Sequence, residues 1–437
     1  MADQSPGLLV VGAAEVVTMA GGLRRGPAQD DPAVLKAVDP TVALWEGRVV
    51  AVGSRSDVER LLVAGGRDVG TFGILDAAGG TVTPGLIDPH THLLFAGSRE
   101  DEIELRQRGA SYLDILAAGG GILSTAAATR AAEEEDLRAH GRRWLDEMLR
   151  HGVTTVEAKS GYGLDLATEM RLLRVADALG REGHVDVLPT FLGLHALPPE
   201  FRGLAEGTER YVDEVVERIL PAVAAAGHAR FCDVFCERGV FTPDQSRRFL
   251  LAGAALGLAP RLHADELAPS GGAELAAEIG ALSADHLAAP SAEGIAALAR
   301  AAEGPGSVVG VVLPSTTLFL MSGHPAPART LIERGIPVAL GTDFNPGTSP
   351  TSNLPLVMSL AVLSLGLSPS EALAAVTVNA AHALALGETH GSLESGRAGD
   401  LVVWDVPTHR QIPYWLGADL VRFVLKRGRV AWEPGGP

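Results

Sequence analysis

Cysteine is scarce in this chain. Its 437 residues include only Cys232 and Cys236, in the segment "FCDVFCE". Two cysteines cannot form the disulfide framework of a small secreted domain. On an extended segment both side chains lie on one face, yet too far apart for an easy disulfide. We therefore expect two buried free thiols in a reducing compartment.

Positive charge and long apolar runs are also limited. The chain has 36 basic against 53 acidic residues and a formal net charge of −17, which argues against nucleic-acid or anionic-membrane partners. The N-terminus has no basic segment typical of a signal peptide. The longest weakly polar stretch, "NLPLVMSLAVLSLGLSPS", has an apolar part of about 14 residues, which is short for a membrane span. We expect a soluble cytoplasmic protein.

The two ends of the chain differ from its middle. Residues 8–80 and the C-terminal end alternate short apolar runs with Gly-rich turns, a pattern typical of strands and hairpins. This predicts one composite β-sandwich domain formed by residues 1–80 and 386–437, with a separate domain, residues 81–385, inserted between the two parts.

The middle of the chain alternates strand-like runs with helical segments. We count eight apolar runs that end in polar residues, at 85–92, 153–161, 185–193, 231–237, 258–266, 281–287, 308–314 and 337–343. Eight strand–helix units predict an α/β fold, a distorted (β/α)8 TIM barrel. A doubly wound sheet is the alternative. It would be expected to carry a Gly-rich phosphate loop after its first strand, and the sequence has no such loop at that position.

Two histidines close the first of these runs. The segment "TPGLIDPHTHLLFAGSRE" places His90 and His92 on either side of Thr91. Residues two apart on a strand point to the same side, so both imidazoles are expected to face the barrel mouth. Imidazole nitrogens are good ligands for zinc or ferrous iron. A lone H-x-H pair is a weak signal, however, and most such pairs bind nothing.

Other strand ends strengthen the signal. His263 closes the fifth run, His286 the sixth and Asp343 the eighth, so all of them are expected at the same mouth. A third histidine and a carboxylate would complete a mononuclear site with room for water. Two metals in such a barrel commonly need a carboxylated lysine at the fourth strand end. Here the lysine is Lys159, at the second, so we expect one metal and a structural or hydrogen-bonding role for Lys159.

Acid–base roles follow from the same strand ends. A metal here lowers the pKa of bound water, and Asp343 is a candidate ligand and a candidate proton acceptor. His286 is expected to orient the water or to stabilise an oxyanion. Glu266, three residues after His263, could pass a proton to a leaving nitrogen. The alternative for Glu266 is a carboxylate at a helix start.

Longer motifs carry a resemblance to a known family. The segments "PGLIDPHTH", "HADE", "DH" and "GTD" resemble an amidohydrolase barrel. The segments "DPHTHLLFAGSRE", "GGGILST", "EAKSGYGLD", "FLGLHALPPE", "LPSTTLFLM" and "GTDFNPGTSPTSNLP" resemble the imidazolonepropionase family, from about residue 80 to 385. The resemblance implies hydrolysis of the lactam C–N bond of 4-imidazolone-5-propanoate to N-formimino-L-glutamate, the third step of L-histidine degradation. It also implies a homodimer.

The resemblance implies site residues as well. It implies one zinc or iron ion per subunit, held by His90, His92, His263 and Asp343. It implies substrate contacts from Arg99, Tyr112, Tyr162, His195, Glu266, Asn345, Gly347 and Thr348. The chemistry agrees, because the carboxylate of a propanoate binds favourably to a cation, and the planar guanidinium of Arg99 can donate two parallel hydrogen bonds to it.

Plainer interpretations stand beside these roles. Arg99 could be a surface arginine paired with Glu100 or Asp101. Tyr162 could be an exposed loop residue, and "DFNPGTSP" could be an ordinary turn, although its backbone could also present Gly347 and Thr348 to an anion.

Two other function classes remain as alternatives. A deaminase acting on an aromatic base would share the metal ligands, but a neutral base offers Arg99 no carboxylate. A non-enzymatic scaffold of this fold would be expected to lose metal ligands, and here all are present.

Overall fold

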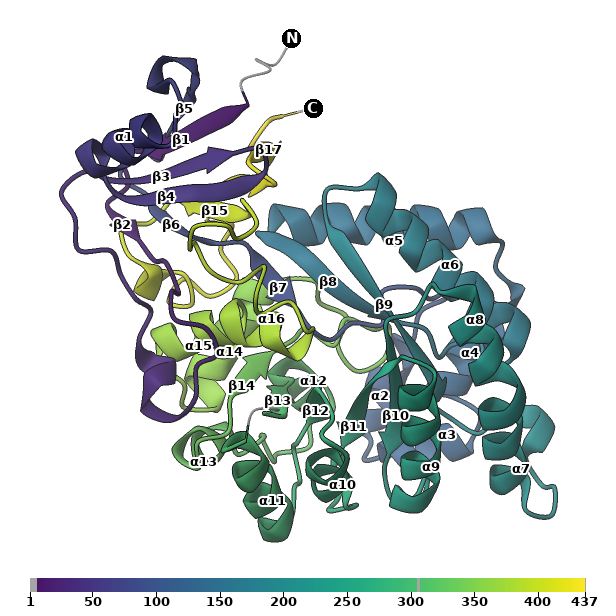
Figure 1. Cartoon of the computed structure of the whole chain (residues 1–437). Coiled ribbons are helices and arrows are strands. Elements are labelled where there is room, and N and C mark those ends of the chain that lie inside the picture. The colour runs from purple at the N-terminus through teal and green to yellow at the C-terminus, as the bar shows by residue number, and fades with distance from the viewer. Residues whose placement is uncertain (1–5, 305–306, 437) are drawn as a thin grey trace.

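The computed structural model describes residues 6–304 and 307–436, and Figure 1 shows an α/β barrel beside a smaller β-rich part that carries both termini. The barrel sheet has eight parallel strands, hydrogen-bonded in chain order from β7 to β14. Their bounds are β7 Leu86–Asp88, β8 Val153–Lys159, β9 Asp186–Leu194, β10 Phe231–Cys236, β11 Ala259–Ala264, β12 Ser283–His286, β13 Val309–Val312 and β14 Val338–Leu340. Each of the eight predicted runs contains one strand, so the barrel prediction is confirmed.

The barrel closes beyond the ends of its first and last strands. Thr91 and Phe344 form an isolated parallel bridge. Beside it, the Asp343 N–H donates to His90 O at 2.9 Å and the His92 N–H donates to Phe344 O at 2.9 Å. The segments that close the sheet are therefore those that carry three of the predicted ligands, and this irregular closure is the distortion of the barrel.

Helices cover the outside of the barrel sheet. In α5 the buried residues are Leu137, Gly141, Leu145, Met148 and Leu149, which form one stripe along the helix. The helices are α1 Arg55–Ala64, α2 Asp101–Gln107, α3 Tyr112–Ala117, α4 Ile122–Ala131, α5 Glu134–Arg150, α6 Leu166–Glu182, α7 Gly207–Glu214, α8 Leu220–Ala226, α9 Pro243–Ala255, α10 Gly272–Ile279, α11 Ala292–Ala302, α12 Pro314–Phe319, α13 Ala328–Glu333, α14 Leu354–Ser364, α15 Pro369–Ala375 and α16 Val378–Ala383. Among the described residues, no helix combines the length and apolar character needed to cross a membrane.

The β-rich part is built from both ends of the chain, as predicted (Figure 1). One sheet has the order β4-β3-β1-β5 and the other β17-β16-β15-β6-β2. The strands are β1 Gly7–Val11, β2 Glu15–Val16, β3 Pro40–Trp45, β4 Arg48–Ser54, β5 Gly73–Asp76, β6 Thr81–Pro84, β15 Leu401–Trp404, β16 Val421–Lys426 and β17 Arg429–Trp432. Strand β6 pairs antiparallel with β15, with Val82 opposite Val403.

A shared core holds the two sheets together. Val10 and Val42 of the first sheet cluster with Val82, Leu401 and Leu425 of the second, and each is at most 1% exposed. The composite sandwich is therefore confirmed as an architecture. The exact domain boundaries at residues 81 and 386 stay predictions, and β6 itself pairs within the composite sheet.

Candidate active site

The first two histidines lie just past the strand that positions them. The predicted run extended to His92, but β7 ends at Asp88, because Pro89 has no N–H to continue the ladder. The bridge to Phe344 keeps the following backbone in place. Thr91 turns away from the ligand atoms and donates its hydroxyl to Glu157 O at 2.6 Å. The prediction was wrong about the strand end and correct that Thr91 points away.

The four predicted metal ligands converge. His92 Nε2 lies 3.4 Å from His263 Nε2 and 3.4 Å from Asp343 Oδ1. His90 Nε2 lies 3.5 Å from the same oxygen of Asp343. Two ligand atoms held tetrahedrally at about 2.1 Å from one zinc ion are about 3.4 Å apart. The spacing of these atoms therefore fits a single ion, and His90, His92 and Asp343 form one of the groups able to hold a metal.

Hydrogen bonding of the ligands also fits a metal. Within the described part of the chain, the buried atoms His90 Nε2 and Asp343 Oδ1 have no hydrogen-bond partner. Buried polar atoms are normally satisfied, so such atoms facing one another indicate a ligand between them. The opposite ring nitrogens are engaged: His90 Nδ1 with Asp285 Oδ2 at 2.6 Å and His263 Nδ1 with Asp233 Oδ1 at 3.0 Å. These bonds aim the Nε2 atoms at the site.

Protonation of the ligand group follows from its burial. Burial lowers the pKa of His92 to about 4, which favours the neutral imidazole that binds metals. At His90 burial acts in the same direction, but the neighbouring carboxylates of Asp285 and Asp343 outweigh it and raise the pKa to about 9. Metal binding at His90 is therefore coupled to proton release.

Asp343 is held by backbone and side chain together. Its backbone φ of 52° lies in the left-handed region, which non-glycine residues rarely adopt. Its Oδ2 accepts a hydrogen bond from Thr316 Oγ1 at 2.6 Å. Burial opposes ionisation of this carboxyl, yet the nearby imidazoles of His90 and His92 keep its pKa well below the usual range. Thr316, at the start of α12, was not predicted as part of the site.

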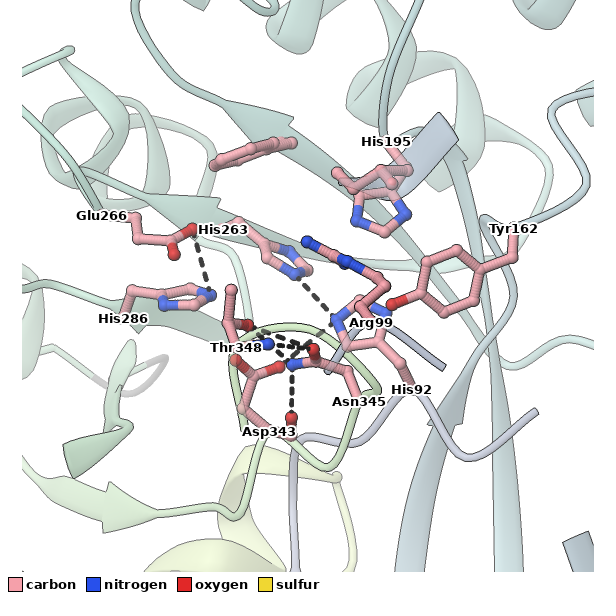
Figure 2. A pocket seen from close by; sticks show the side chains of 12 residues that line it. His92, Arg99, Tyr162, His195, His263, Glu266, His286, Asp343, Asn345 and Thr348 are labelled. Atoms are coloured by element: carbon pink, nitrogen blue, oxygen red, sulfur yellow. Dashed lines mark hydrogen bonds and ion pairs between the residues drawn. The ribbon is translucent and has the colours of Figure 1, made fainter. Parts of the chain in front are cut away.

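Glu266 and His286 face each other across the pocket. Glu266 Oε2 lies 3.7 Å from His286 Nε2, as Figure 2 shows. Burial, reinforced by Asp343 and Glu237, raises the pKa of Glu266 well above its ordinary value. Burial lowers the pKa of His286 well below its own. The two shifts favour a protonated carboxyl on Glu266 and a neutral imidazole on His286.

Glu266 does not start a helix. It follows β11, and the next helix, α10, begins at Gly272. The alternative of a helix-start carboxylate is therefore wrong. Because the carboxyl is buried and faces the pocket, it suits a proton donor.

One pocket contains most of the predicted site residues (Figure 2). It is lined by His92, Arg99, Ile122, Tyr162, His195, Phe235, His263, Glu266, His286, Asp343, Asn345 and Thr348. Ile122 and Phe235 were not predicted, because apolar residues in a barrel are indistinguishable by sequence from ordinary core. Tyr112 begins α3, and its side chain lies outside the described part of the structure.

Two aromatic rings form one wall of the pocket. Tyr162 is 2% exposed, so the alternative of an exposed loop tyrosine is wrong. His195 follows β9 and stacks on His92 with centroids 5.1 Å apart. The bond between His195 Nδ1 and Gly161 O, 2.9 Å long, fixes the ring, and burial lowers its pKa well below the usual value. Both rings suit contact with a flat, polar substrate.

Arg99 is buried at the pocket and held by one carboxylate. It is 6% exposed, and its Nε and Nη2 donate to the two oxygens of Glu102 at 3.0 and 2.9 Å. The alternative of a surface pair with Glu100 or Asp101 is therefore wrong. Glu102 also accepts hydrogen bonds from Arg106 Nη2 at 2.9 Å and from the Gly121 N–H at 2.8 Å. This carboxylate, missed in the sequence, orients two cations.

The segment after β14 forms a turn that is closed by Asn345. Asn345 Oδ1 accepts the N–H groups of Gly347 at 2.8 Å and Thr348 at 2.7 Å. The two backbone donors that were expected to meet an anion are thus used within the turn. Asn345 Nδ2 donates to Asp343 O at 2.7 Å, which ties the turn to the ligand.

The lysine and cysteine predictions can also be placed. Lys159 Nζ donates to Glu157 Oε1 at 2.8 Å and Asp233 Oδ2 at 2.7 Å, in agreement with a hydrogen-bonding role. Cys232 and Cys236 are both buried free thiols, so the prediction of no disulfide is confirmed.

Known sequences place the chain in a family. It is 49% identical to an imidazolonepropionase of Geobacillus kaustophilus (strain HTA426) over 429 residues, 98% of each chain. It is also 49% identical to an imidazolonepropionase of Symbiobacterium thermophilum, again over 98% of each chain. The chain belongs to the imidazolonepropionase family. The model of the amidohydrolase family matches residues 271–431.

Solved structures share the fold of this imidazolonepropionase family member. An adenosine deaminase from Xanthomonas campestris with bound zinc superposes with a TM-score of 0.68 at 20% identity, covering 98% of this chain and 93% of the other. A 5-methylcytosine deaminase from Klebsiella pneumoniae reaches a TM-score of 0.70 at 16% identity, covering 98% of each chain. At such identities the likeness shows the barrel fold alone.

Proposed function

We propose that this chain hydrolyses the lactam C–N bond of 4-imidazolone-5-propanoate to give N-formimino-L-glutamate, the third step of L-histidine degradation. The observation that carries the proposal is the position of Arg99 in the same pocket as the ligand group, in a chain 49% identical to an imidazolonepropionase. A cation suits the propanoate, and the rings of Tyr162 and His195 suit the flat imidazolone.

The metal proposal rests on the ligand geometry. We propose one zinc or iron ion per chain, held by His90, His92, His263 and Asp343. When bound, such an ion polarises a carbonyl oxygen and lowers the pKa of water. The spacings of 3.5 Å between His90 and Asp343 and of 3.4 Å between His92 and each of Asp343 and His263 support one ion. Lys159 is engaged by two carboxylates, which supports its separation from any second metal.

The chain's own groups can move the protons of the reaction. Asp343, ionised in the pocket, can accept a proton from the attacking water. Glu266, whose pKa is raised by burial, can donate one to the leaving ring nitrogen, whose C–N bond breaks as the ring opens. His286, neutral and 3.7 Å from Glu266, can donate a hydrogen bond to the oxygen that gains negative charge.

Substrate orientation is assigned to the opposite side of the pocket. Arg99, fixed by Glu102, would bind the propanoate, and Asn345 and Thr348 would contact the polar edge of the substrate. The N–H of Gly347 is used within the turn that Asn345 closes. Gly347 would therefore contribute through its lack of a side chain, which leaves space for the guanidinium of Arg99. The homodimer and the cytoplasmic location expected from the sequence stay predictions.

The test is direct. Purified protein incubated with 4-imidazolone-5-propanoate should form N-formimino-L-glutamate, detected by mass spectrometry, with loss of the imidazolone absorbance. A panel of aromatic bases assayed for ammonia release serves as the control for the deaminase alternative. Ammonia release from a base without turnover of the imidazolone would contradict the proposal.

A further inference from the structure

Five charged side chains form a buried ionic cluster below the ligand group. They are Glu157, Lys159, Asp233, Arg261 and Asp285, and each is at most 1% exposed. They come from β8 and from the three neighbouring strands β10, β11 and β12 of the same barrel sheet. Burying so many charges is costly, so such a cluster in a core needs a reason beyond stability.

Lys159 lies at the centre of this cluster. Its Nζ is 2.8 Å from Glu157 Oε1, 2.7 Å from Asp233 Oδ2 and 3.7 Å from Asp285 Oδ2. Arg261 supports Asp285 separately, with Nη2 at 3.1 Å from its Oδ2. Lysine therefore bridges carboxylates that would otherwise repel one another in a dry environment.

Each bridged carboxylate holds a part of the ligand group. The second oxygen of Asp233 accepts from the His263 backbone N–H at 3.2 Å and pairs with His263 Nδ1 at 3.0 Å. The second oxygen of Glu157 accepts the Thr91 N–H at 3.2 Å, and Thr91 stands between His90 and His92. Lys159 is therefore linked to His263 through Asp233, and to the backbone between His90 and His92 through Glu157.

We propose that Lys159 is a positioning residue that sets the affinity of the ligand group for its metal ion, by fixing Asp233 behind His263 and Glu157 behind the His90–His92 segment. The inference rests on the metal-dependent function proposed above. Carboxylates that orient ligating histidines commonly contribute 10- to 100-fold to metal affinity, and a group that fixes such a carboxylate should act over a similar range of roughly 10- to 100-fold.

A charge effect and a positioning effect of Lys159 predict opposite changes in metal affinity when the lysine is removed. If Lys159 acted through its charge alone, removing a cation near the site would tighten metal binding. If it acts by position, its removal lets Asp233 and Glu157 turn away and weakens metal binding. The double variant Glu157→Gln, Lys159→Met removes one charge of each sign, so it isolates the effect of position.

A matched control exists at the other end of β8. Lys426 is also a buried lysine between two carboxylates, with Nζ 2.6 Å from Asp400 Oδ2 and 2.7 Å from Asp186 Oδ2. It donates to Thr154 O at 2.9 Å, five residues before Lys159 and so about 17 Å away along the strand. The variant Asp400→Asn, Lys426→Met loses a comparable buried pair that contacts none of the four proposed ligands. It also removes a carboxylate from a separate group able to hold a metal, Asp186, His390 and Asp400, so zinc binding in the control is measured with the number of ions bound.

The experiment measures zinc affinity apart from hydrolysis. Metal-depleted full-length wild type, the Glu157/Lys159 variant and the control are titrated with Zn²⁺ in competition with a chromophoric chelator, below the unfolding temperature of all three. We expect roughly 10- to 100-fold weaker binding in the Glu157/Lys159 variant and unchanged binding in the control. Equal or tighter binding in the Glu157/Lys159 variant, or equal weakening in the control, would overturn the proposal.

A second variant covers failure of the first to fold. Lys159→Gln keeps an N–H donor and removes the charge, and we expect a smaller loss of zinc affinity. Wild-type affinity in that variant would overturn the proposal. Hydrolysis of 4-imidazolone-5-propanoate by wild type is assayed separately. If the variants bind zinc more weakly but wild type is inactive, only the proposed reaction is contradicted. If wild type is active but the variants bind zinc as wild type does, only the role of Lys159 is contradicted.

Discussion

The guanidinium of Arg99 lies directly against the backbone of Gly347. A β-carbon added at residue 347 would lie 2.0 Å from Arg99 Cζ, closer than any real contact. Arg106 Nη1 donates to Gly347 O at 2.8 Å on the same segment. The absence of a side chain at residue 347 therefore decides where the guanidinium of Arg99 can lie, although the two residues are far apart in sequence.

Gly347→Ala should push the guanidinium of Arg99 out of place. We expect kcat/KM for 4-imidazolone-5-propanoate to fall by roughly 10- to 100-fold, mainly through KM, because a displaced fork loses its hydrogen bonds to a carboxylate. Steady-state kinetics measure this. Gly53→Ala is the control, since its β-carbon would meet ordinary contacts at 3.6 and 3.8 Å in the distant sandwich.

Arg99→Met should leave folding and metal content intact and weaken substrate recognition by about 2–5 kcal/mol, the range for losing one partner of a desolvated charge pair. Glu102 keeps Arg106 as a partner, which limits the structural damage. Lysine at the same position should rescue only part of the loss, because it lacks the planar fork.

A substrate analogue without the carboxylate tests whether Arg99 binds the propanoate. Wild type should hydrolyse the analogue much less efficiently than the substrate. Arg99→Met and wild type should hydrolyse the analogue with nearly the same efficiency. If the variant discriminates against the analogue as strongly as wild type, Arg99 does not bind the propanoate.

Glu266→Gln keeps the shape of the side chain and removes its proton. We expect turnover to fall by roughly 10²–10⁴, the range for a lost general acid, with metal still bound. Near-normal turnover would return Glu266 to a structural role.

The pH profile gives an independent test of Glu266. Burial raises its pKa, so its acid form persists to a higher pH than in an ordinary glutamate and is lost as the pH rises through that raised value. Wild-type kcat should therefore decline on the alkaline side, and the Gln variant should lack that decline. A wild-type profile that rises throughout this range would contradict a proton-donor role.

Metal content provides a further test. Elemental analysis should give about one zinc or iron per chain, because the spacings of 3.4–3.5 Å among the proposed ligand atoms suit a single ion. A chelator should abolish activity, and added metal should restore it. Two tightly held metals in each active chain would contradict the mononuclear site.

Sequence patterns predicted much of the fold and the candidate metal ligands. The eight apolar runs each contain a barrel strand, because buried parallel strands read as continuous apolar segments. His90, His92, His263 and Asp343 were recognisable because strand ends of a barrel meet at one mouth. The position of Asp343 could be predicted, but its left-handed backbone could not, since such a φ depends on tertiary contacts.

The supporting residues were harder to predict. Asp233 lies within an apolar strand, where a lone carboxylate signals a buried partner but does not name it. Glu102 looks like one of several acids in α2, because only the fold brings Arg99, Arg106 and Gly121 around it. Thr316 and Asp343 are 27 residues apart, and their hydrogen bond depends on how α12 follows β13.

The pairing of β6 with β15 has a consequence for how the chain is made. Val82 pairs with Val403, so more than three hundred further residues must be synthesised after β6 before its neighbour β15 leaves the ribosome. Contacts so distant in sequence form slowly, and unpaired strand edges are prone to wrong association until they do. Strand β6 therefore depends on the barrel to bring back its partner β15, and a chain released before Leu401 would leave Val82 on an open edge.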